Sequence, residues 1–385
     1  MREYDVCIVG GGAAGLAAAA LLKKELRVCI LEKNEILGRK LAATGGGRCN
    51  LTNRACSGKD ATLDFFASIG IETYCDEEGR YYPYTNRAAD VIKALTDAAT
   101  AGKGDAETAE KGDAAGAAVF CNSAVTDVTK EDGRFVIKTA KDSFTADCLI
   151  LATGGKAAPQ YGTTGDGYGI ARSLGHTVGR VYPILTPVEC GGVDFQKLKG
   201  IRAKAQVSLY RDGVPVEGAP KETGEVQFTD DGLSGICVFN LTPFIKAEEG
   251  ESVSDAIARY SITADFAPDF TAGDLQERTS SFGILTGALA EIADEQMADA
   301  GCGAAFIKDW RFPVKSVKGW RYAQCTAGGV DTAEIDMETM ESKLVPRLYL
   351  TGELLDEQGP CGGFNLQNAW ETAMKAAKAI NGKDR

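Results

Sequence analysis

The sequence predicts an α/β protein in which both ends of the chain build one domain around a separate insertion. A buried-strand pattern, a glycine-rich turn, an apolar helix and a second strand follow one another within Tyr4–Glu32. An apolar strand and a helix, "RLYLTGELLD" and "NLQNAWETAMKAAKAI", close the chain. From Val181 to about Leu241, apolar and polar residues alternate in short runs, as in antiparallel strands. The expected parts are a domain formed by 1–185 and 325–385, a strand-rich insertion over 186–245, and a helical segment with its return connection over 246–324.

The composition is typical of a soluble globular protein of two or three domains. The 385 residues are 44% hydrophobic and 25% charged. The net charge of −12 argues against a general polyanion-binding surface. No apolar run has membrane-spanning length, and the N-terminus enters a strand at once without a signal-peptide pattern. We therefore expect a cytoplasmic protein that does not bind a membrane.

The cysteines and the single histidine limit the chemistry that the side chains offer. Twelve cysteines occur without a CxxC pair, and Cys7, Cys29 and Cys148 lie in apolar strand-like runs, where a thiol acts as a small hydrophobe. His176 follows a helix-like segment and is expected to be a turn residue rather than a catalytic base. A single histidine nearly excludes His-rich metal sites and limits Ser-His-Asp machinery to that residue. We therefore predict no metal, and we expect the chemistry to come from a cofactor.

The first strand–turn–helix–strand unit carries a dinucleotide fingerprint. Gly10, Gly12 and Gly15 form GxGxxG, and Glu32 ends the second strand about 20 residues later. Gly10 permits the tight turn, Gly12 lets the backbone approach a pyrophosphate, and Gly15 lets the helix pack close to the strand. Glu32 would accept hydrogen bonds from the adenosine ribose, and the helix N-terminus attracts phosphate.

Further along the chain, Ala98–Ala118 is a low-complexity tract of Ala, Gly, Asp, Glu and Lys, which we expect to be a mobile surface excursion. Hairpin-like segments follow and end in an apolar strand that runs into Ala152, Thr153 and Gly154. The acidic stretch Glu249–Trp310 has a helix-like pattern.

Six segments, in this order, resemble one family: "DVCIVGGGAAGLAAA", "GRKLAATGGGRCNLTN", "TGGKAAPQYGTTGDGYGIARSLGHT", "GEVQFTDDGLSG", "TAGGVDTAEIDMETMESKLVPRLYLTGELLD" and "GGFNLQNAW". They are similar to the BaiN-like, or aminoacetone-oxidase-like, family of FAD-dependent oxidoreductases. This resemblance implies a Rossmann-like FAD-binding domain of the two-dinucleotide-binding type, an inserted β-barrel-like domain and a helical segment. It also implies one of three activities: reduction of carbon–carbon double bonds, amine oxidation, or reduction of a uridine in ribosomal RNA.

In this resemblance, Gly38–Asn50 wraps the diphosphate and reaches the isoalloxazine. Arg39 and Lys40 suit the phosphate charge, and the helix that begins near Gly363 points its dipole at the flavin pyrimidine. The backbone at Val125 is expected beside the adenine. The implied set that binds non-covalent FAD is Gly10, Gly12, Ala13, Ala14, Gly15, Glu32, Lys33, Gly38, Arg39, Lys40, Thr44, Gly45, Gly46, Gly47, Arg48, Asn50, Val125, Ala152, Thr153, Gly154, Gly352, Glu353, Asp356, Gly363, Phe364, Asn365 and Leu366.

Four residues are candidates for the chemistry: Arg48, Cys49, Asn50 and Asn365. Cys49 is either a proton donor near the flavin or a packed, inert thiol. We expect catalysis where the Arg48 loop, the Asn365 loop and the inserted domain meet, with Tyr81 or Tyr82 lining the substrate side.

The expected reaction is hydride transfer between flavin N5 and a small organic substrate, with reduction of a C=C bond as the preferred direction. The reductant is either NAD(P)H, reacting transiently at the flavin, or another reductant. A first alternative is a reductase of a uridine in ribosomal RNA. It would use the basic, aromatic run "KDWRFPVKSVKGWRY" to hold phosphates and stack bases, although a solvated connection with buried aromatic residues is the preferred explanation of that run in so acidic a chain. A second alternative is a flavin redox sensor without turnover. The sequence makes no prediction of oligomeric state.

Overall fold

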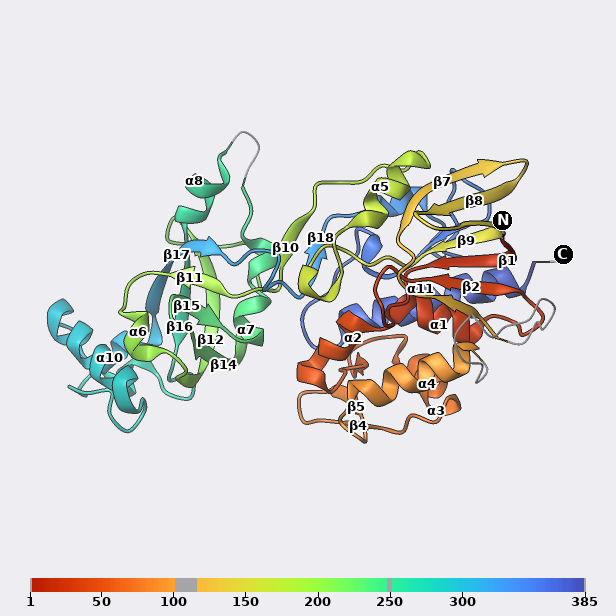
Figure 1. Cartoon of the computed structure of the whole chain (residues 1–385). Coiled ribbons are helices and arrows are strands. Elements are labelled where there is room, and N and C mark those ends of the chain that lie inside the picture. The colour runs from red at the N-terminus through yellow and green to blue at the C-terminus, as the bar shows by residue number, and fades with distance from the viewer. Residues whose placement is uncertain (1, 101–115, 248–250, 384–385) are drawn as a thin grey trace. The chain divides into compact units, whose positions relative to one another are not determined.

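The structure, a computed structural model, describes residues 2–100, 116–247 and 251–383. It divides into two compact units: Met1–Tyr182 with Cys325–Arg385 is unit 1, and Pro183–Gln324 is unit 2 (Figure 1). The chain leaves unit 1 through β10 (Tyr182–Ile184) and returns to it at β18 (Cys325–Ala327).

Unit 1 is built on a seven-stranded sheet with the order β6-β2-β1-β9-β8-β7, in which β19 also pairs with β9. β6, β2, β1, β9 and β19 are parallel, whereas β7 and β8 form an antiparallel hairpin beside β9. β8 pairs with the first half of β9 and β19 with its second half, so strands from both ends of the chain share one sheet. The bounds are β1 (Arg2–Val9), β2 (Val28–Leu31), β6 (Ala118–Phe120), β7 (Val125–Glu131), β8 (Arg134–Thr139), β9 (Ser143–Leu151) and β19 (Leu348–Leu350).

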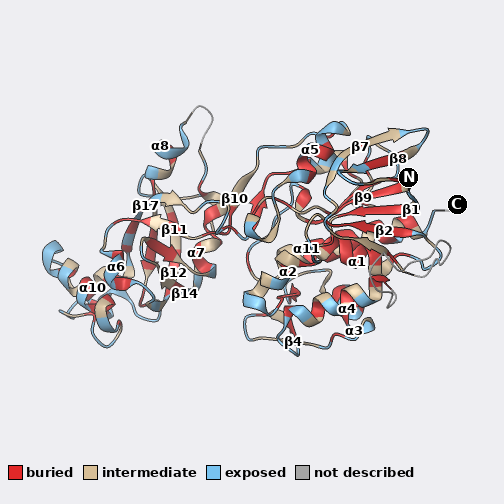
Figure 2. Ribbon diagram, in the orientation of Figure 1, coloured by how far each residue is buried: buried red, intermediate tan, exposed pale blue. Residues whose placement is uncertain are grey.

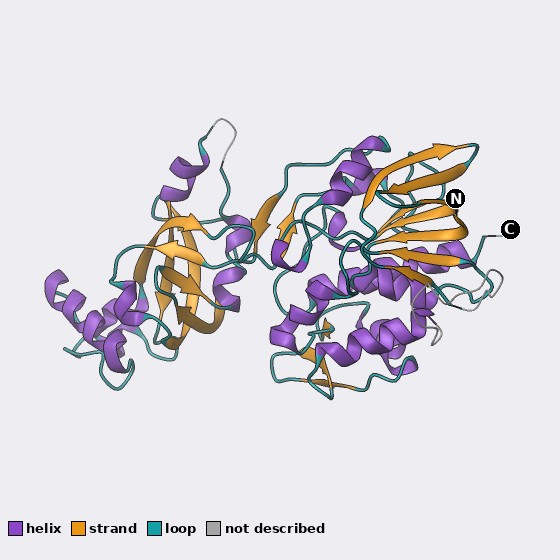
Figure 3. Cartoon of the chain, viewed as in Figure 1, coloured by secondary structure: helices purple, strands orange, loops and turns teal. Residues whose placement is uncertain are grey.

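Three helices pack together beside this sheet: α1 (Ala13–Leu21), α4 (Ala88–Thr100) and α11 (Phe364–Asn381) (Figure 3). α1 is mostly alanine and leucine and is buried along nearly its whole length, because α4 and α11 both contact it. The buried side chains of β1, β2 and β9 form the core beneath them (Figure 2). The shorter helices of this unit are α2 (Arg39–Ala43), α3 (Lys59–Ser68) and α5 (Asp166–Ser173), with 3₁₀ turns η1 (Thr44–Gly47), η3 (Pro159–Tyr161), η6 (Thr332–Glu334) and η7 (Gly352–Leu354).

A small antiparallel sheet with the order β3-β5-β4 extends from the loop after η1. It places Thr52 opposite Tyr81 and Tyr74 opposite Tyr82. Its strands are β3 (Thr52–Asn53), β4 (Thr73–Cys75) and β5 (Arg80–Pro83).

Unit 2 is a closed six-stranded barrel. Its strands follow the order β12-β14-β15-β11-β17-β16, and pairing of β12 with β16 closes the ring, while β13 extends one edge. The strands are β11 (Val188–Cys190), β12 (Arg202–Arg211), β13 (Val214–Pro215), β14 (Glu222–Phe228), β15 (Gly232–Ser234), β16 (Tyr260–Asp265) and β17 (Trp310–Val317). The predicted α/β fold class with an inserted β-barrel is therefore confirmed.

The stretch 246–324 differs from the helical segment that we expected. It contains α8 (Val253–Ala258), α9 (Ala272–Leu275), α10 (Gly287–Ala300) and η5 (Ala304–Lys308), but it also supplies β16 and β17 to the barrel. In β17 every second residue is buried, including Trp310, Phe312 and Val314, so its pattern is that of a strand. The helices α8 and α9 on either side of β16, and α10 and η5 before β17, made the stretch look helical in the sequence. The remaining elements of unit 2 are α6 (Phe195–Leu198), α7 (Ile236–Phe239) and η4 (Thr242–Phe244).

All twelve cysteines lie in the described part and are free thiols. Cys7, Cys29 and Cys148 are buried in β1, β2 and β9, as small hydrophobes in a core. Within the described ranges, no helix is long and apolar enough for a membrane crossing, and no group of three or more His, Cys, Asp or Glu side chains is arranged to hold a metal ion.

Most of the low-complexity tract, residues 101–115, lies outside the described residues. The ends of that gap are close together, because the N–H of Ala117 donates to the carbonyl of Ala99 at 2.8 Å.

We predict that a four-residue Gly-Ser linker in place of 101–115 leaves flavin content unchanged and does not lower the free energy of unfolding. Closing a shorter loop between ends that already touch should raise that free energy by about 1 kcal/mol. Urea unfolding of the two proteins measures the difference. A loss of more than about 2 kcal/mol would contradict the prediction and show that the tract packs on the domain.

Candidate active site

The GxGxxG turn joins β1 to α1 and is shaped by contacts that leave no room for side chains at two of its glycines. Gly10 has φ +108°, and a Cβ there would collide with the carbonyl oxygen of Ala152. A Cβ on Gly15 would collide with the carbonyl oxygen of Gly10. Around Gly12, in contrast, a Cβ would meet nothing within 4 Å. Gly10 and Gly15 are thus required by packing, whereas Gly12 borders open space at the N-terminus of α1.

Glu32, which is 8% exposed, holds this turn through its carboxylate. Its Oε2 accepts the N–H of Gly11 at 2.8 Å, and its Oε1 accepts the backbone N–H and the side-chain amide of Asn34 at 2.8 and 2.6 Å. A carboxylate has about four acceptor positions, so one remains for a hydroxyl group. Asn34 was missed in the sequence, although its place two residues after Glu32 is the signal that could have revealed it.

The glycine-rich loop Gly38–Asn50 lies against the fingerprint turn. The N–H of Gly38 donates to the carbonyl of Gly11 at 2.9 Å. Gly45, Gly46 and Gly47 all have positive φ, at 56°, 66° and 87°. A Cβ on Gly46 or Gly47 would meet nothing within 4 Å. Their backbone is therefore exposed on an open side, as the sequence predicts for a surface that a ligand approaches.

The second glycine-rich loop, before α11, docks directly on the first. Asn53 donates to the carbonyl of Gly362 at 2.8 Å, and the hydroxyl of Thr52 donates to Gln367 at 2.6 Å. The indole of Trp370 donates to the carbonyl of Leu51 at 2.9 Å. The structure thus brings together two loops that are more than 300 positions apart in the sequence. Thr52, Gln367 and Trp370 were missed as site residues, although all three lie within the motifs "RCNLTN" and "NLQNAW".

Asn50 lies at the contact of these loops and has an acceptor without a partner. The residue is 8% exposed, and its Oδ1 makes no hydrogen bond with any residue that the structure describes. A Cβ on Gly363 would lie 2.9 Å from this atom, so glycine keeps it uncovered. A buried, unpaired acceptor is costly unless a ligand satisfies it. The pyrimidine part of a flavin carries an N–H donor, and the open glycines suit its phosphates, so the residues present fit FAD.

The two cations predicted to bind phosphate, Arg39 and Lys40, and the predicted cofactor-binding Lys33 are all bonded to other residues of the protein. Lys40 forms an ion pair with Glu353 at 2.6 Å, and Lys33 pairs with Asp166. Arg39 donates to the amide oxygen of Asn34 at 2.9 Å and to the carbonyl of Gln160 at 3.2 Å, both of which are neutral partners. Of these three cations, only Arg39 keeps a charge that no carboxylate of the described residues offsets.

The carboxylate of Glu353 is bonded to several groups of the protein and is not free to bind a ligand by itself. Besides Lys40, it accepts the N–H of Thr326 at 2.9 Å. The hydroxyl of Thr326 in turn accepts the N–H groups of Lys156 and Ala157 at 2.8 and 3.0 Å. Thr326 was also missed in the sequence, where nothing marks it as a partner of Glu353.

Asn365 binds its own loop. Its amide oxygen accepts the N–H of Gly359 at 2.9 Å, and its amide nitrogen donates to the carbonyls of Gly359 and Pro360 at 2.9 and 3.2 Å. The side chain therefore shapes the loop before α11, which makes Asn365 a positioning residue in this structure.

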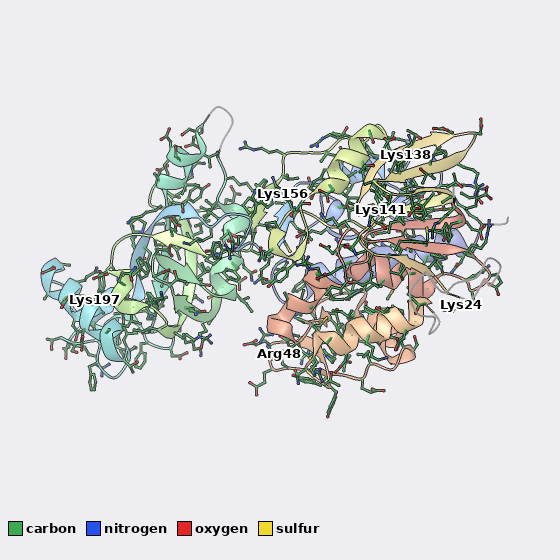
Figure 4. The ribbon with its side chains drawn as sticks, viewed as in Figure 1. Lys24, Arg48, Lys138, Lys141, Lys156 and Lys197 are labelled. Atoms are coloured by element: carbon green, nitrogen blue, oxygen red, sulfur yellow. The ribbon has the colours of Figure 1, made fainter. Side chains whose placement is uncertain are left out.

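Arg48 is exposed (Figure 4), and its guanidinium contacts Tyr82. Its guanidinium carbon lies 4.3 Å from the centre of the Tyr82 ring. Its Nε donates to the carbonyl of Gly45 at 3.2 Å and its Nη2 to the hydroxyl of Tyr82 at 3.3 Å. Tyr82 itself is 2% exposed, and its burial raises the pKa of its hydroxyl, which stays neutral.

The other predicted cofactor-binding residues lie in unit 1, at the ends of its strands or in the first turns of its helices. Ala13 and Ala14 form the first turn of α1, and Thr44 begins η1. Asp356 is exposed beyond η7, and its N–H donates to the carbonyl of Val330. Val125 begins β7, and the segment Ala152–Gly154 follows β9. Gly352 begins η7. The first turn of α11 contains Phe364 and Leu366. A contribution of the inserted domain stays a prediction.

Comparison with known proteins agrees with this arrangement. The family model described as HI0933-like protein Rossmann domain matches residues 4–62 and 56–379. The chain belongs to this family. The resemblance to BaiN-like proteins is thereby confirmed, and as a member of the family the chain is a flavoprotein oxidoreductase.

Two relatives match over nearly their whole length. The 3-dehydro-bile acid delta(4,6)-reductase of Clostridium scindens is 32% identical over 97% of this chain and 98% of its own. The ribosomal RNA dihydrouridine synthase of Escherichia coli strain K12 is 27% identical over 99% of this chain and 98% of its own. Among solved structures, 3-ketosteroid-delta4-(5alpha)-dehydrogenase from Rhodococcus jostii RHA1 shares the fold over 99% of this chain and 97% of its own, with a TM-score of 0.52 at 12% identity.

We predict that Gly12→Val folds normally but loses flavin. The residue has φ −89° and open space around its Cβ position, so valine fits the protein and occupies only the space of the pyrophosphate. The free energy of unfolding of the flavin-free protein should change by no more than about 0.5 kcal/mol. Flavin absorbance after reconstitution measures binding. Gly169→Val, at an exposed glycine of α5 with equal space, is the matched control that keeps flavin; retention of flavin by Gly12→Val would refute this reading of the turn.

We predict that Cys49 is a neutral packing residue. Its side chain is fully buried, and burial raises the pKa of its thiol to about 12. The stabilisation from burying the neutral thiol is complete below about pH 9 and is lost as the pH rises toward 12, because only the unfolded state then ionises freely. Cys49 should resist alkylation in the folded protein at pH 8, as peptide mapping would show, and Cys49→Ala should keep the pH profile of turnover. A profile that loses a titration in Cys49→Ala would make this thiol a proton donor.

Proposed function

We propose that this protein binds FAD non-covalently and reduces a carbon–carbon double bond of a small organic molecule with NAD(P)H as the reductant. The observation that carries the proposal is the meeting of the two glycine-rich loops around the unpaired Oδ1 of Asn50. The relative named 3-dehydro-bile acid delta(4,6)-reductase supports the choice of a C=C bond.

The chain's own residues bind and orient. The turn at Gly12 and the first turn of α1 would hold the diphosphate through backbone N–H groups and the positive end of the helix dipole. Glu32 would accept from the ribose, and Asn50 would accept from the flavin edge. When bound, FAD supplies two-electron transfer between nicotinamide and substrate.

The overall reaction balances without a further co-reactant. NAD(P)H gives a hydride, which is one proton with two electrons, and becomes NAD(P)⁺. The solvent gives a second proton, and the C=C bond becomes a CH–CH single bond. No metal is called for in this chemistry. A cytoplasmic location remains a prediction of the sequence.

Reduction of a uridine in ribosomal RNA is the second candidate, because the Escherichia coli relative with that activity spans the whole chain. The basic run Lys308–Tyr322 offers little support for it. Trp310 is in the barrel core, Lys308 pairs with Asp265, and Lys318 pairs with Glu189 and Asp231. Arg311 also pairs with Asp309 at 2.9 Å, so three of the five cations of the run are neutralised, and its first aromatic residue is unavailable for stacking.

We predict that the flavin-loaded protein, mixed without oxygen with NADPH or NADH and a 3-oxo-4-ene bile acid, forms a product heavier by two hydrogens. Mass spectrometry identifies the product, and flavin absorbance follows reduction and reoxidation separately. A ribosomal RNA transcript tested in parallel for dihydrouridine distinguishes the second candidate. If nicotinamide reduces the flavin but no acceptor of either class reoxidises it, the proposed reductase function is wrong and a redox sensor is favoured.

A further inference from the structure

We infer that Arg48 is a specificity residue that binds an anionic group of the substrate, a carboxylate, so that the enzyme acts on unsaturated acids rather than on neutral compounds. Because it concerns the same substrate, this role of Arg48 rests on the proposed function. The first ground is the immobility of the side chain. Stacking on Tyr82 and two hydrogen bonds, to Tyr82 and to the Gly45 carbonyl, hold the guanidinium in one orientation.

The second ground is that this fixed guanidinium keeps donors and charge to spare. Arg48 forms no ion pair with any residue of the described ranges, and its Nη1 group makes no hydrogen bond with any of them. A guanidinium presents five N–H donors, of which Arg48 uses one from Nε and one from Nη2. The remaining donors of Nη1 and Nη2 form the planar fork that binds a carboxylate through two parallel hydrogen bonds.

The third ground is contrast with the neighbouring cations. Lys40 and Lys33 are each paired with a carboxylate, and Arg39 is held by Asn34 and Gln160. Arg48 is therefore the cation of this loop that combines an open fork with an exposed position.

The fourth ground is the position of Arg48 on the loop. It stands between the open glycines Gly46 and Gly47, which border empty space, and Asn50, whose Oδ1 has no partner among the described residues. A molecule bound against this backbone would meet the guanidinium at its edge. A fork held by Tyr82 loses little freedom when it binds, so the interaction favours binding more than a mobile surface arginine would.

The test compares acids with matched neutral derivatives in equilibrium binding to the FAD-loaded protein. The probes are 3-oxo-4-cholenoic acid with its methyl ester, and cinnamate with cinnamamide. Perturbation of the flavin absorbance gives the dissociation constants without any need for turnover. We expect the wild-type protein to bind at least one acid about tenfold or more tightly than its neutral partner, the effect of a charge-assisted pair.

Three variants separate the role of the fork from other effects. In Arg48→Met the acid and its neutral partner should bind with about equal dissociation constants. The dissociation constant of the acid should rise, whereas that of the neutral partner should change much less. Arg48→Lys should restore only part of it, because an ammonium is a point charge without a fork. Arg54→Met is the matched control, because Arg54 is an exposed arginine next to β3 whose guanidinium contacts Cys75, and it should keep the full preference.

The outcomes distinguish this inference from the proposed function. Equal binding of acid and neutral partner in every wild-type pair overturns the role of Arg48, as does a preference that survives in Arg48→Met. Loss of flavin or a changed flavin potential in Arg48→Met, with the preference intact, would make Arg48 a flavin ligand instead. Preferential binding of an acid that is never reduced would sustain the role of Arg48 and refute the C=C reductase.

Discussion

The contact between the two glycine-rich loops is the constraint on which the rest of the site depends. Gly363 has φ +105°, and a Cβ there would lie 2.6 Å from the backbone oxygen of Thr52, so no other residue allows the loops to approach this closely. Three hydrogen bonds then join residues 51–53, which directly follow the first loop, to the carbonyl of Gly362 in the second loop and to Gln367 and Trp370 of α11. Because β19 and α11 come from the end of the chain, the site is completed only when both ends have joined the same sheet. Separation in sequence makes this closure slow and costly in entropy, and the buried hydrogen bonds offset that cost.

The charges of the site show how an acidic protein can hold a diphosphate without a cluster of free cations. Lys40 and Lys33 are neutralised by carboxylates, so they order the loops around the site rather than bind phosphate directly. What remains is Arg39, whose partners are neutral, and the backbone: the open turn at Gly12, the first turn of α1 and the uncovered glycines after Thr44. Binding through backbone N–H groups depends on shape more than on net charge, which is compatible with a chain that carries −12. The free charge of Arg48 is then available for the substrate.

The sequence predicted those parts of the site that depend on neighbours along the chain. GxGxxG with Glu32 requires only one strand–helix–strand unit, and the structure has that unit where the pattern placed it. Pairings between distant residues were not predictable in this way. Lys40 and Glu353 are 313 positions apart, and nothing local indicates that one carboxylate removes the charge of the other. Asn365 fits a flavin edge as a residue type, but the choice between the ligand and its own loop is made by the backbone at Gly359. The strands β16 and β17 were missed because they pair with each other across a long helical stretch, and their other partners, β12 and β11, are distant in the sequence.

His176 illustrates why an arrangement of residues is not by itself a mechanism. Its Nε2 lies 2.8 Å from the hydroxyl of Ser342 and its Nδ1 2.9 Å from the carboxylate of Glu334, the connections of a Ser-His-acid triad. The hydroxyl, however, also accepts the N–H groups of Leu344 and Val345 at 3.0 and 2.8 Å. Both of its lone pairs are therefore occupied, its hydrogen is directed to the ring, and the ring's other nitrogen donates to Glu334. An oxygen that accepts two backbone donors in a buried position has no lone pair with which to attack a substrate. The three side chains instead join the turn after α5, η6 and the loop before β19. They therefore stabilise the position of β19, the strand that leads to η7 and to the loop before α11.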